Sequence, residues 1–212
     1  MKTLFSFLFI SILSAHHMHA QLYASGSAGA LIISEYTTSA SPVILPGANI
    51  SFGYYDFMYG YDGFVMAGWG LPKKSQYASD YFGASFIGDT VTVDETVNWY
   101  SLGLGGTYWL GEANNVPVMF GVSAGFELIY QRVEQNSTWN GDPLTYSYSG
   151  SDINSFIGMK LMLLPTDVLG VGFDALFKTP INYDVELYSV SGVYPSKGVG
   201  GYLRLSVLYY IE

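Results

Sequence analysis

Apolar and polar residues alternate along several stretches of the chain, most regularly between residues 198 and 212. There, Leu203, Leu205 and Val207 share one parity, whereas Arg204 and Ser206 share the other. Such alternation is typical of a β-strand with one apolar face. The stretch also exceeds the roughly 9–11 residues that a tilted strand needs to cross a bilayer. The pattern therefore predicts a membrane-crossing strand, which avoids aggregation by pairing within a closed barrel.

Seven further stretches alternate well enough to predict strands. They cover residues 21–35, 47–57, 64–71, 98–110, 117–134, 151–164 and 168–178. The segments between them are long at 36–46, 72–97, 135–150 and 179–197, and short at 58–63, 111–116 and 165–167. Long loops on one rim and short turns on the other are typical of bacterial outer-membrane barrels. We therefore predict an all-β, antiparallel up-and-down transmembrane β-barrel of eight strands.

Two local patterns refine this prediction. Residues 80–87 and 90–95 flank Gly88-Asp89 and predict a short hairpin that stands above the membrane. If both segments crossed the bilayer instead, the barrel would have ten strands. Asp62-Gly63 is a strong hairpin-turn signal and predicts the turn between the second and third strands.

Composition supports a membrane barrel over a soluble sheet protein. Half of the residues are hydrophobic and only 12% are charged, about half the usual share in a soluble domain. No apolar run is long enough for a transmembrane helix, and only helices and closed barrels satisfy the backbone in lipid. A soluble β-sandwich would be expected to carry more charge on its outward faces.

Aromatic residues are expected to form two belts at the lipid–water interfaces. One rim would collect Tyr23, Tyr55, Phe57, Tyr59, Tyr108, Trp109, Tyr209 and Tyr210, and the other Tyr36, Trp99, Tyr100, Tyr130 and Phe177.

The beginning of the chain reads as a secretory signal peptide. Lys2 precedes an apolar run at residues 4–13, and Ala20 offers a small residue at the expected cleavage site. Ala15 is an alternative site. We therefore divide the chain into a signal peptide, 1–20, and a barrel domain, 21–212, that is exported through the inner membrane.

These features together resemble the small OmpA/OmpX-type outer-membrane barrels of Gram-negative bacteria. The resemblance covers the whole mature chain and includes a final strand with apolar residues on its outward parity. It implies a location in the outer membrane, contact with outer-membrane lipid and lipopolysaccharide, and recognition of the last strand by the barrel-assembly machinery. In that family this strand usually ends in an aromatic residue, whereas here it ends Tyr210-Ile211-Glu212.

The residue inventory argues against an enzyme. All three histidines lie within residues 1–20 and there is no cysteine. The His-dependent barrel enzymes, which include lipid A deacylases, acyltransferases and omptin proteases, are thereby excluded. Asp94-Glu95, Asp184 and Glu186 are interpreted as solvated loop charges. We expect no catalytic site, no cofactor and no metal, although carboxylates alone would suit a hard cation. The chain has no basic patch for nucleic acid.

Four charged residues are expected inside the barrel: Glu127, Lys160, Asp174 and Arg204. Each lies mid-strand on the parity opposite the apolar face, and a basic residue facing lipid would cost roughly 2–4 kcal/mol near the midplane. Equal heights on neighbouring strands predict an Asp174–Arg204 pair. Lys160 is expected to contact Glu127 or Asp174.

Large residues on the same inward parity predict a lumen filled by side chains: Tyr55, Trp109, Met162, Tyr202 and Leu208. A filled lumen favours a structural or surface-interaction role through the long extracellular loops. The alternative is a narrow, porin-like channel or a carrier of a small hydrophobic ligand. The extracellular partner is unknown from the sequence.

Overall fold

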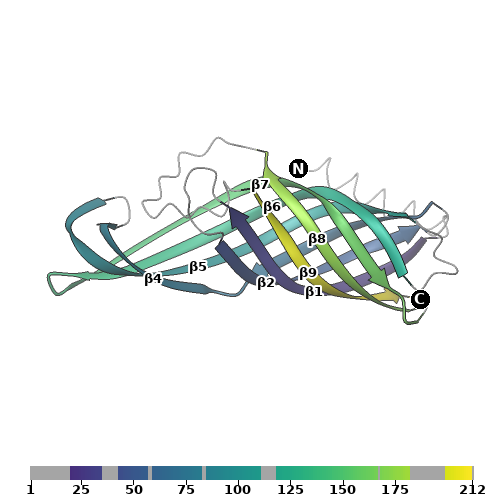
Figure 1. Ribbon diagram of the computed structural model, residues 1–212, viewed down its shortest axis with the longest axis horizontal. Coiled ribbons are helices and arrows are strands. Elements are labelled where there is room, and N and C mark those ends of the chain that lie inside the picture. The colour runs from purple at the N-terminus through teal and green to yellow at the C-terminus, as the bar shows by residue number, and fades with distance from the viewer. Residues whose placement is uncertain are drawn as a thin grey trace, which may run out of the picture.

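The computed structural model describes residues 20–34, 43–56, 59–82, 85–110, 118–166, 168–181 and 199–211 (Figure 1). The predicted signal peptide lies outside these residues except for Ala20, as do the turn at 111–116 and most of the connection at 179–197. None of the described residues forms a helix that is long and apolar enough to cross a membrane.

The described residues form nine antiparallel strands. They are β1 Ala20–Ser34, β2 Val43–Asp56, β3 Tyr61–Gly70, β4 Lys73–Phe82, β5 Ser85–Leu110, β6 Val118–Trp139, β7 Asp142–Leu163, β8 Leu169–Pro180 and β9 Val199–Ile211.

Eight of these strands close a ring. Strands that follow each other in the sequence pair, except β3 and β4; in addition, β9 pairs with β1 and β3 pairs directly with β5. The ring therefore passes from β3 to β5 without β4, which pairs only with β5, from Lys73↔Val97 upward. The predicted eight-stranded barrel is confirmed, and the two extra segments between β3 and β5 do not add two strands to the ring.

Three strands are far longer than a membrane crossing requires. β5 has 26 residues, and β6 and β7 have 22 each. Together with β4 they extend beyond the ring, and Figure 1 shows this extension projecting well past the other strands. Bacterial barrels have short periplasmic turns and long extracellular connections, so we expect the extension to lie on the extracellular side.

The predicted loop at 135–150 is wrong. β6 continues to Trp139 and β7 begins at Asp142, so only two residues join them. Asn140 and Gly141 have φ of 51° and 87°, both in the left-handed region that a two-residue type I′ turn requires. Both faces of this hairpin lie outside lipid, so both can carry polar residues such as Asn and Ser. The alternation of apolar and polar residues that would reveal a strand is therefore weak here.

The turns predicted at Gly88-Asp89 and Asp62-Gly63 are also displaced. Phe82 pairs with Ser85, so the chain reverses between these two residues, whereas Gly88-Asp89 lies in β5 beside a register shift. The predicted strand at 80–87 thus covers the end of β4 and the start of β5, whereas 90–95 lies wholly within β5. The chain turns at Tyr59-Gly60 between β2 and β3, and Asp62-Gly63 lies within β3.

Alternate residues face the lumen and the outside. The outward face is apolar around the barrel, with exposed side chains that include Ile50, Phe52, Val65, Leu102, Leu104, Phe126, Leu128, Ile157, Met159, Phe173, Leu205 and Val207. Such a continuous apolar band around a closed barrel favours a lipid surrounding, because soluble monomers rarely expose more than a few hundred Å² in one patch.

The prediction of two aromatic belts is correct only in part. Tyr59, Tyr108 and Tyr209 at one rim, and Tyr100, Tyr130 and Phe177 at the other, are exposed on the outward face. Tyr23, Tyr55, Trp99, Trp109 and Tyr210 are instead at most 4% exposed and pack inside the barrel. Phe57 and Tyr36 lie outside the described residues.

Candidate functional site

The candidate site is the lumen, which is layered along the strands. On β1 the inward residues run from Tyr23 through Ser25 and Ser27 to Leu31. On β9 they run from Tyr210 through Ser206 and Arg204 to Tyr202. Polar side chains therefore occupy the middle of the lumen, with large apolar and aromatic side chains above and below them.

Two clusters of buried side chains form the outer layers. The periplasmic cluster contains Tyr23, Tyr55, Trp109, Met119, Met162, Leu208 and Tyr210. The extracellular cluster contains Leu31, Leu45, Met66, Val97, Trp99, Ile129, Val133, Phe156, Leu176 and Tyr202. Neighbouring rings within them meet edge-on or tilted, as for Tyr55 and Trp109 at 6.5 Å between centroids and Trp99 and Tyr202 at 6.3 Å.

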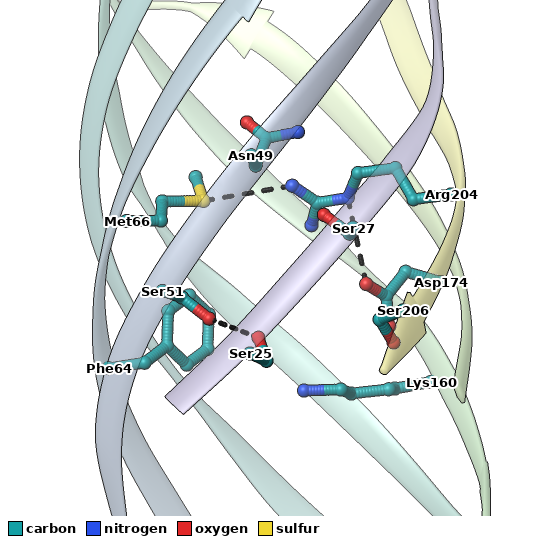
Figure 2. Close-up of a pocket in the computed structure, with 10 residues that line it drawn as sticks. All are labelled: Ser25, Ser27, Asn49, Ser51, Phe64, Met66, Lys160, Asp174, Arg204 and Ser206. Atoms are coloured by element: carbon teal, nitrogen blue, oxygen red, sulfur yellow. Dashed lines mark hydrogen bonds and ion pairs between the residues drawn. The ribbon is translucent and has the colours of Figure 1, made fainter. Parts of the chain in front are cut away.

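The middle layer, here called the polar chamber, encloses a cavity of about 30 Å³. One water molecule needs roughly 10–15 Å³ of such space, so the chamber has room for one or two. Figure 2 shows the residues that line it: Ser25, Ser27, Asn49, Ser51, Phe64, Met66, Lys160, Asp174, Arg204 and Ser206.

Asp174 and Arg204 lie directly opposite each other on β8 and β9. Arg204 Nε is 3.6 Å from Asp174 Oδ2, and both side chains are less than a tenth exposed. The guanidinium also approaches Met66 across the lumen, with 3.7 Å between Nη1 and the sulfur (Figure 2). The structure thus brings together the two residues that the strand heights suggested.

Lys160 does not make the contact expected from the sequence. It faces Asp174 across β7 and β8, but its ammonium lies over the rings of Trp109 and Phe64, 5.5 and 5.6 Å from their centroids. Neither Glu127 nor Asp174 is its ion-pair partner among the described residues. The long lysine side chain reaches across the chamber to the electron-rich ring faces instead.

Glu127 is paired with a residue that the sequence reasoning did not select. Lys178 Nζ lies 3.7 Å from Glu127 Oε2, and both side chains are at most 1% exposed. The hydroxyl of Tyr202 lies 3.0 Å from each carboxylate oxygen and donates a hydrogen bond there. Lys178 also lies over the Tyr202 ring, 5.2 Å from its centroid. The sequence did contain a signal for Lys178, because it has the inward parity. It was not selected because it is the last residue of the predicted strand 168–178.

Asp62 is a buried acid that the sequence reasoning missed, because Asp62-Gly63 had been assigned to a turn. It is 4% exposed and accepts hydrogen bonds from the backbone N–H of Thr107 at 2.9 Å and the indole N–H of Trp109 at 3.1 Å. These hydrogen bonds to Asp62 connect the first residues of β3 to β5.

Glu95 also differs from the prediction, since it is not a solvated loop charge. It is 4% exposed on β5 and accepts hydrogen bonds from Gln135 Nε2 at 2.8 Å and the Tyr77 hydroxyl at 3.3 Å. Its neighbour Asp94 is exposed, as predicted, and accepts a bond from Gln76. Asp184 and Glu186 lie outside the described residues.

No group of three or more Asp, Glu, His or Cys within the described ranges could hold a metal ion. Asp62, Glu127 and Asp174 are held by donors from different strands rather than gathered at one point. This arrangement fixes the inner wall of the barrel and offers no converging set of ligands.

The extension has a different construction. Its inward face carries Phe82, Val91 and Val93, buried under Tyr77, Ile87, Trp139, Leu144 and Tyr146. Its outward face is polar and includes an exposed ion pair, Arg132–Glu134, with 2.8 Å between the charged atoms. Among the residues that the structure describes, 142–152 of β7 pair only with β6 and β4 pairs only with β5, so each outer strand of this four-stranded sheet has one side without a partner strand there.

Comparison with known proteins places this fold. No family model matches the chain, and no curated protein matches its sequence. Among solved structures, Neisserial surface protein A is similar with a TM-score of 0.55 and 15% identity, covering 91% of this chain and 99% of that one. A major outer membrane protein from Thermus thermophilus is similar with a TM-score of 0.57 and 14% identity, covering 91% and 100%.

At these identities the likeness concerns the fold. It agrees with the closed ring of eight strands, the lipid-facing band and the expectation of an OmpA/OmpX-type architecture. The chain therefore has the fold of the small outer-membrane β-barrels.

Proposed function

We propose that this protein is a non-enzymatic surface barrel with a closed lumen, whose four-stranded extension contacts partners outside the cell. The observation that carries the proposal is the extension itself. Three strands continue in unbroken register from the membrane-crossing wall into a sheet that the barrel does not need for closure. Positioned loops and hairpins on a rigid scaffold are where binding functions concentrate.

The packing of the lumen supports the closed state. One layer of large side chains lies above the polar chamber and one lies below it, and the chamber itself has room for one or two waters. Tyr202, at 2% exposed, and Trp109, at 3%, each lie in one of these layers and are held by hydrogen bonds to Glu127 and Asp62. An eight-stranded barrel has an interior that side chains are expected to fill.

The shape and polarity of the extension support a binding role. Within the described ranges, its two outer strands, β4 and the first half of β7, each pair with one strand only, and another polypeptide strand could extend such a sheet by β-augmentation. The partly buried rings of Trp139 and Tyr146 add an aromatic surface on the inward face, a residue type enriched at interfaces.

The remaining parts of the proposal follow from the sequence. Residues 1–20 would direct export, 21–212 would form the barrel domain, and β9 would present the assembly signal to the barrel-insertion machinery. Outer-membrane lipid and lipopolysaccharide would surround the apolar band.

Shortening the extension tests the binding role. Deleting residues 134–139 and 142–147 joins Val133 and Tyr148, which already pair, through the existing Asn140-Gly141 turn. Because six residues leave each strand, the inward and outward parities are kept. Cells producing the full-length protein are expected to adsorb phage or adhere to cultured host cells more than non-producing cells, and the shortened variant should lose this gain. Equal behaviour of all three strains would contradict the proposal.

Conductance in a planar bilayer tests the closed lumen, with a narrow channel as the competing function. The polar chamber is the one observation in favour of a channel, since it carries charges in the middle of the lumen. The closed barrel predicts a silent membrane after insertion of heat-modifiable, folded protein. Reproducible stepwise openings would establish the channel instead.

A further inference from the structure

A lysine, an asparagine and a glutamate lie together on three neighbouring strands inside the barrel wall. Glu127 of β6 and Asn154 of β7 are direct partners across their strands. Lys178 of β8 pairs with Phe156, two residues along β7 from Asn154. Because β7 lies between β6 and β8, the Lys178 side chain must pass over β7 to place Nζ 3.7 Å from Glu127 Oε2. It therefore crosses β7 beside the inward side chain of Asn154.

The three side chains are shut off from solvent. Glu127 and Lys178 are each 1% exposed and Asn154 is 0% exposed. Two members of the extracellular cluster contact or face them: Tyr202 donates to Glu127, and Phe156 lies opposite Lys178. The amine of Lys178 thus lies in an apolar layer of the lumen from which bulk water is excluded.

Two polar atoms of this group are left without hydrogen bonds. Within the described residues, neither Lys178 Nζ nor Asn154 Oδ1 has a hydrogen-bond partner, and Asn154 Nδ2 donates only to the carbonyl of Asp152, at 3.4 Å. Nearly all buried polar side-chain atoms in folded proteins are satisfied, so these exceptions require an explanation. A covalent bond between the two side chains would remove both of them.

The group contains the parts that such a reaction needs. A lysine is a nucleophile as the free amine, and a carboxylate within reach can remove its proton. An apolar surrounding favours this transfer, because it replaces two buried charges by two neutral groups. The carboxamide carbon of Asn154 is the electrophile, and paired strands hold it close to the amine, which lowers the entropic cost of the reaction.

We propose that Lys178 and Asn154 form an isopeptide bond, with Glu127 as the proton carrier. The Nζ–Cγ bond forms and the Cγ–Nδ2 bond breaks. Lys178 gives two protons to the leaving nitrogen, one of them through Glu127, and this nitrogen departs as ammonium. While it is protonated, Glu127 supplies the donor that Asn154 Oδ1 lacks. It ends as a carboxylate, still hydrogen-bonded to Tyr202.

The bond would join β7 to β8 by a covalent link between side chains. β7 continues into the extension, so the link would fix the membrane-crossing half of that strand to its neighbour. Lys160, the other buried lysine of β7, is expected to stay free. Its ammonium lies over the rings of Phe64 and Trp109 and has no carboxylate within ion-pair distance among the described residues.

The mass of the protein tests the bond. Protein purified from outer membranes and then denatured is expected to be about 17 Da lighter than its sequence, because one ammonia leaves when an amine displaces a carboxamide nitrogen. Lys178→Met, Asn154→Leu and Glu127→Gln should abolish this loss. An N-terminal Gln21 also loses ammonia when it cyclises, so each mass is read against that of Lys178→Met, which has the same N-terminus.

Tryptic peptides locate the bond. Trypsin should not cut after Lys178, because the modified side chain carries no charge. It should instead release residues 133–160 joined to residues 161–197. Fragmentation of this branched peptide should place the junction at Asn154. A junction at Asp152, which would form with loss of water, would contradict the proposal.

Two further variants complete the test, with heat-modifiable migration on gels as the check that each is folded. Asn154→Asp should lose water, about 18 Da, and so reach the same final mass as wild type. Lys160→Met is the matched control, since it removes a buried lysine that is 8% exposed, and it should keep the ammonia loss. Folded wild type at the same relative mass as Lys178→Met, or wild-type peptides without the junction, would overturn the proposal whatever the variants do.

Discussion

Asp174 and Arg204 form a buried pair in the middle of the lumen, and its removal has a predictable cost. Replacing Asp174 with Ala leaves the guanidinium buried without its counter-charge. Breaking such a pair costs about 3–5 kcal/mol. We expect the Asp174→Ala variant to lose about this much free energy of unfolding, measured by urea titration in lipid vesicles.

A double-mutant cycle separates the pair from other effects of the substitution. Arg204→Met alone should also destabilise the barrel, and the double variant should recover part of the summed loss. Additive losses would show that the two charges do not interact. Glu134→Ala is a useful control because the Arg132–Glu134 contact is shorter, at 2.8 Å, yet its side chains are 56% and 39% exposed. It should cost at most about 1 kcal/mol.

The Tyr202 hydroxyl gives a second prediction at this scale. It donates to both oxygens of buried Glu127 at 3.0 Å. Tyr202→Phe keeps the ring, over which Lys178 lies, and removes only the donor. A hydrogen bond to a charged group contributes about 1.5–3 kcal/mol, so the free energy of unfolding should fall by that amount. An unchanged urea midpoint would mean that the hydroxyl does not support the carboxylate.

The parity of a residue along its strand was sufficient to predict which charged side chains point into the lumen. It was not sufficient to predict which of them contact each other. Glu127, Lys160, Asp174 and Arg204 are all buried, as their parity indicated. Pairing also depends on the stagger between strands and on side-chain length, neither of which alternation records. Lys160 therefore reaches the rings of Phe64 and Trp109, while Lys178 takes the position beside Glu127.

At the scale of elements, the β6–β7 hairpin depends on its two-residue turn. Gly141 has a φ of 87°, and a Cβ there would meet nothing within 4 Å. The cost of Gly141→Val is therefore conformational, about 1–2 kcal/mol for a side chain in the left-handed region. Hydrogen exchange of the amides near the tip of β6 and β7 should speed up by roughly tenfold, because local opening becomes easier.

Gly26→Ala provides the comparison for the turn variant. Its Cβ would also meet nothing within 4 Å, but its backbone has no positive φ. Exchange near the hairpin tip should stay as in wild type. Equal exchange in Gly141→Val and wild type would show that the left-handed turn does not control the hairpin.

The elements were predictable where lipid imposes a contrast between the two faces. Within the barrel, the apolar parity of Leu203, Leu205 and Val207 is outward, as expected. In the extension, water or a polar surface lies on the outward side and the contrast weakens. Residues 135–150 consequently resembled a loop, although Asn140-Gly141 is a recognised hairpin-turn sequence.

At the scale of the whole molecule, orientation in the membrane can be tested with introduced cysteines, because the chain has none of its own. Asp142→Cys places a thiol at the tip of the extension, and Pro165→Cys places one in the short turn between β7 and β8. Both positions are exposed. A membrane-impermeant maleimide should label the first in intact cells and the second only after the outer membrane is opened. The reverse pattern would invert the topology.

The β6–β7 hairpin has a mechanical consequence. Its 22 residues per strand pair without a break from Val118↔Leu163 at the periplasmic rim to Trp139↔Asp142 at the tip. A force applied to the tip along the strand direction loads many inter-strand hydrogen bonds at once, in shear. The force is transmitted to the barrel wall, which the surrounding lipid holds in place. If the extension binds a partner as proposed, it would therefore form a mechanically stiff link between the barrel and that partner.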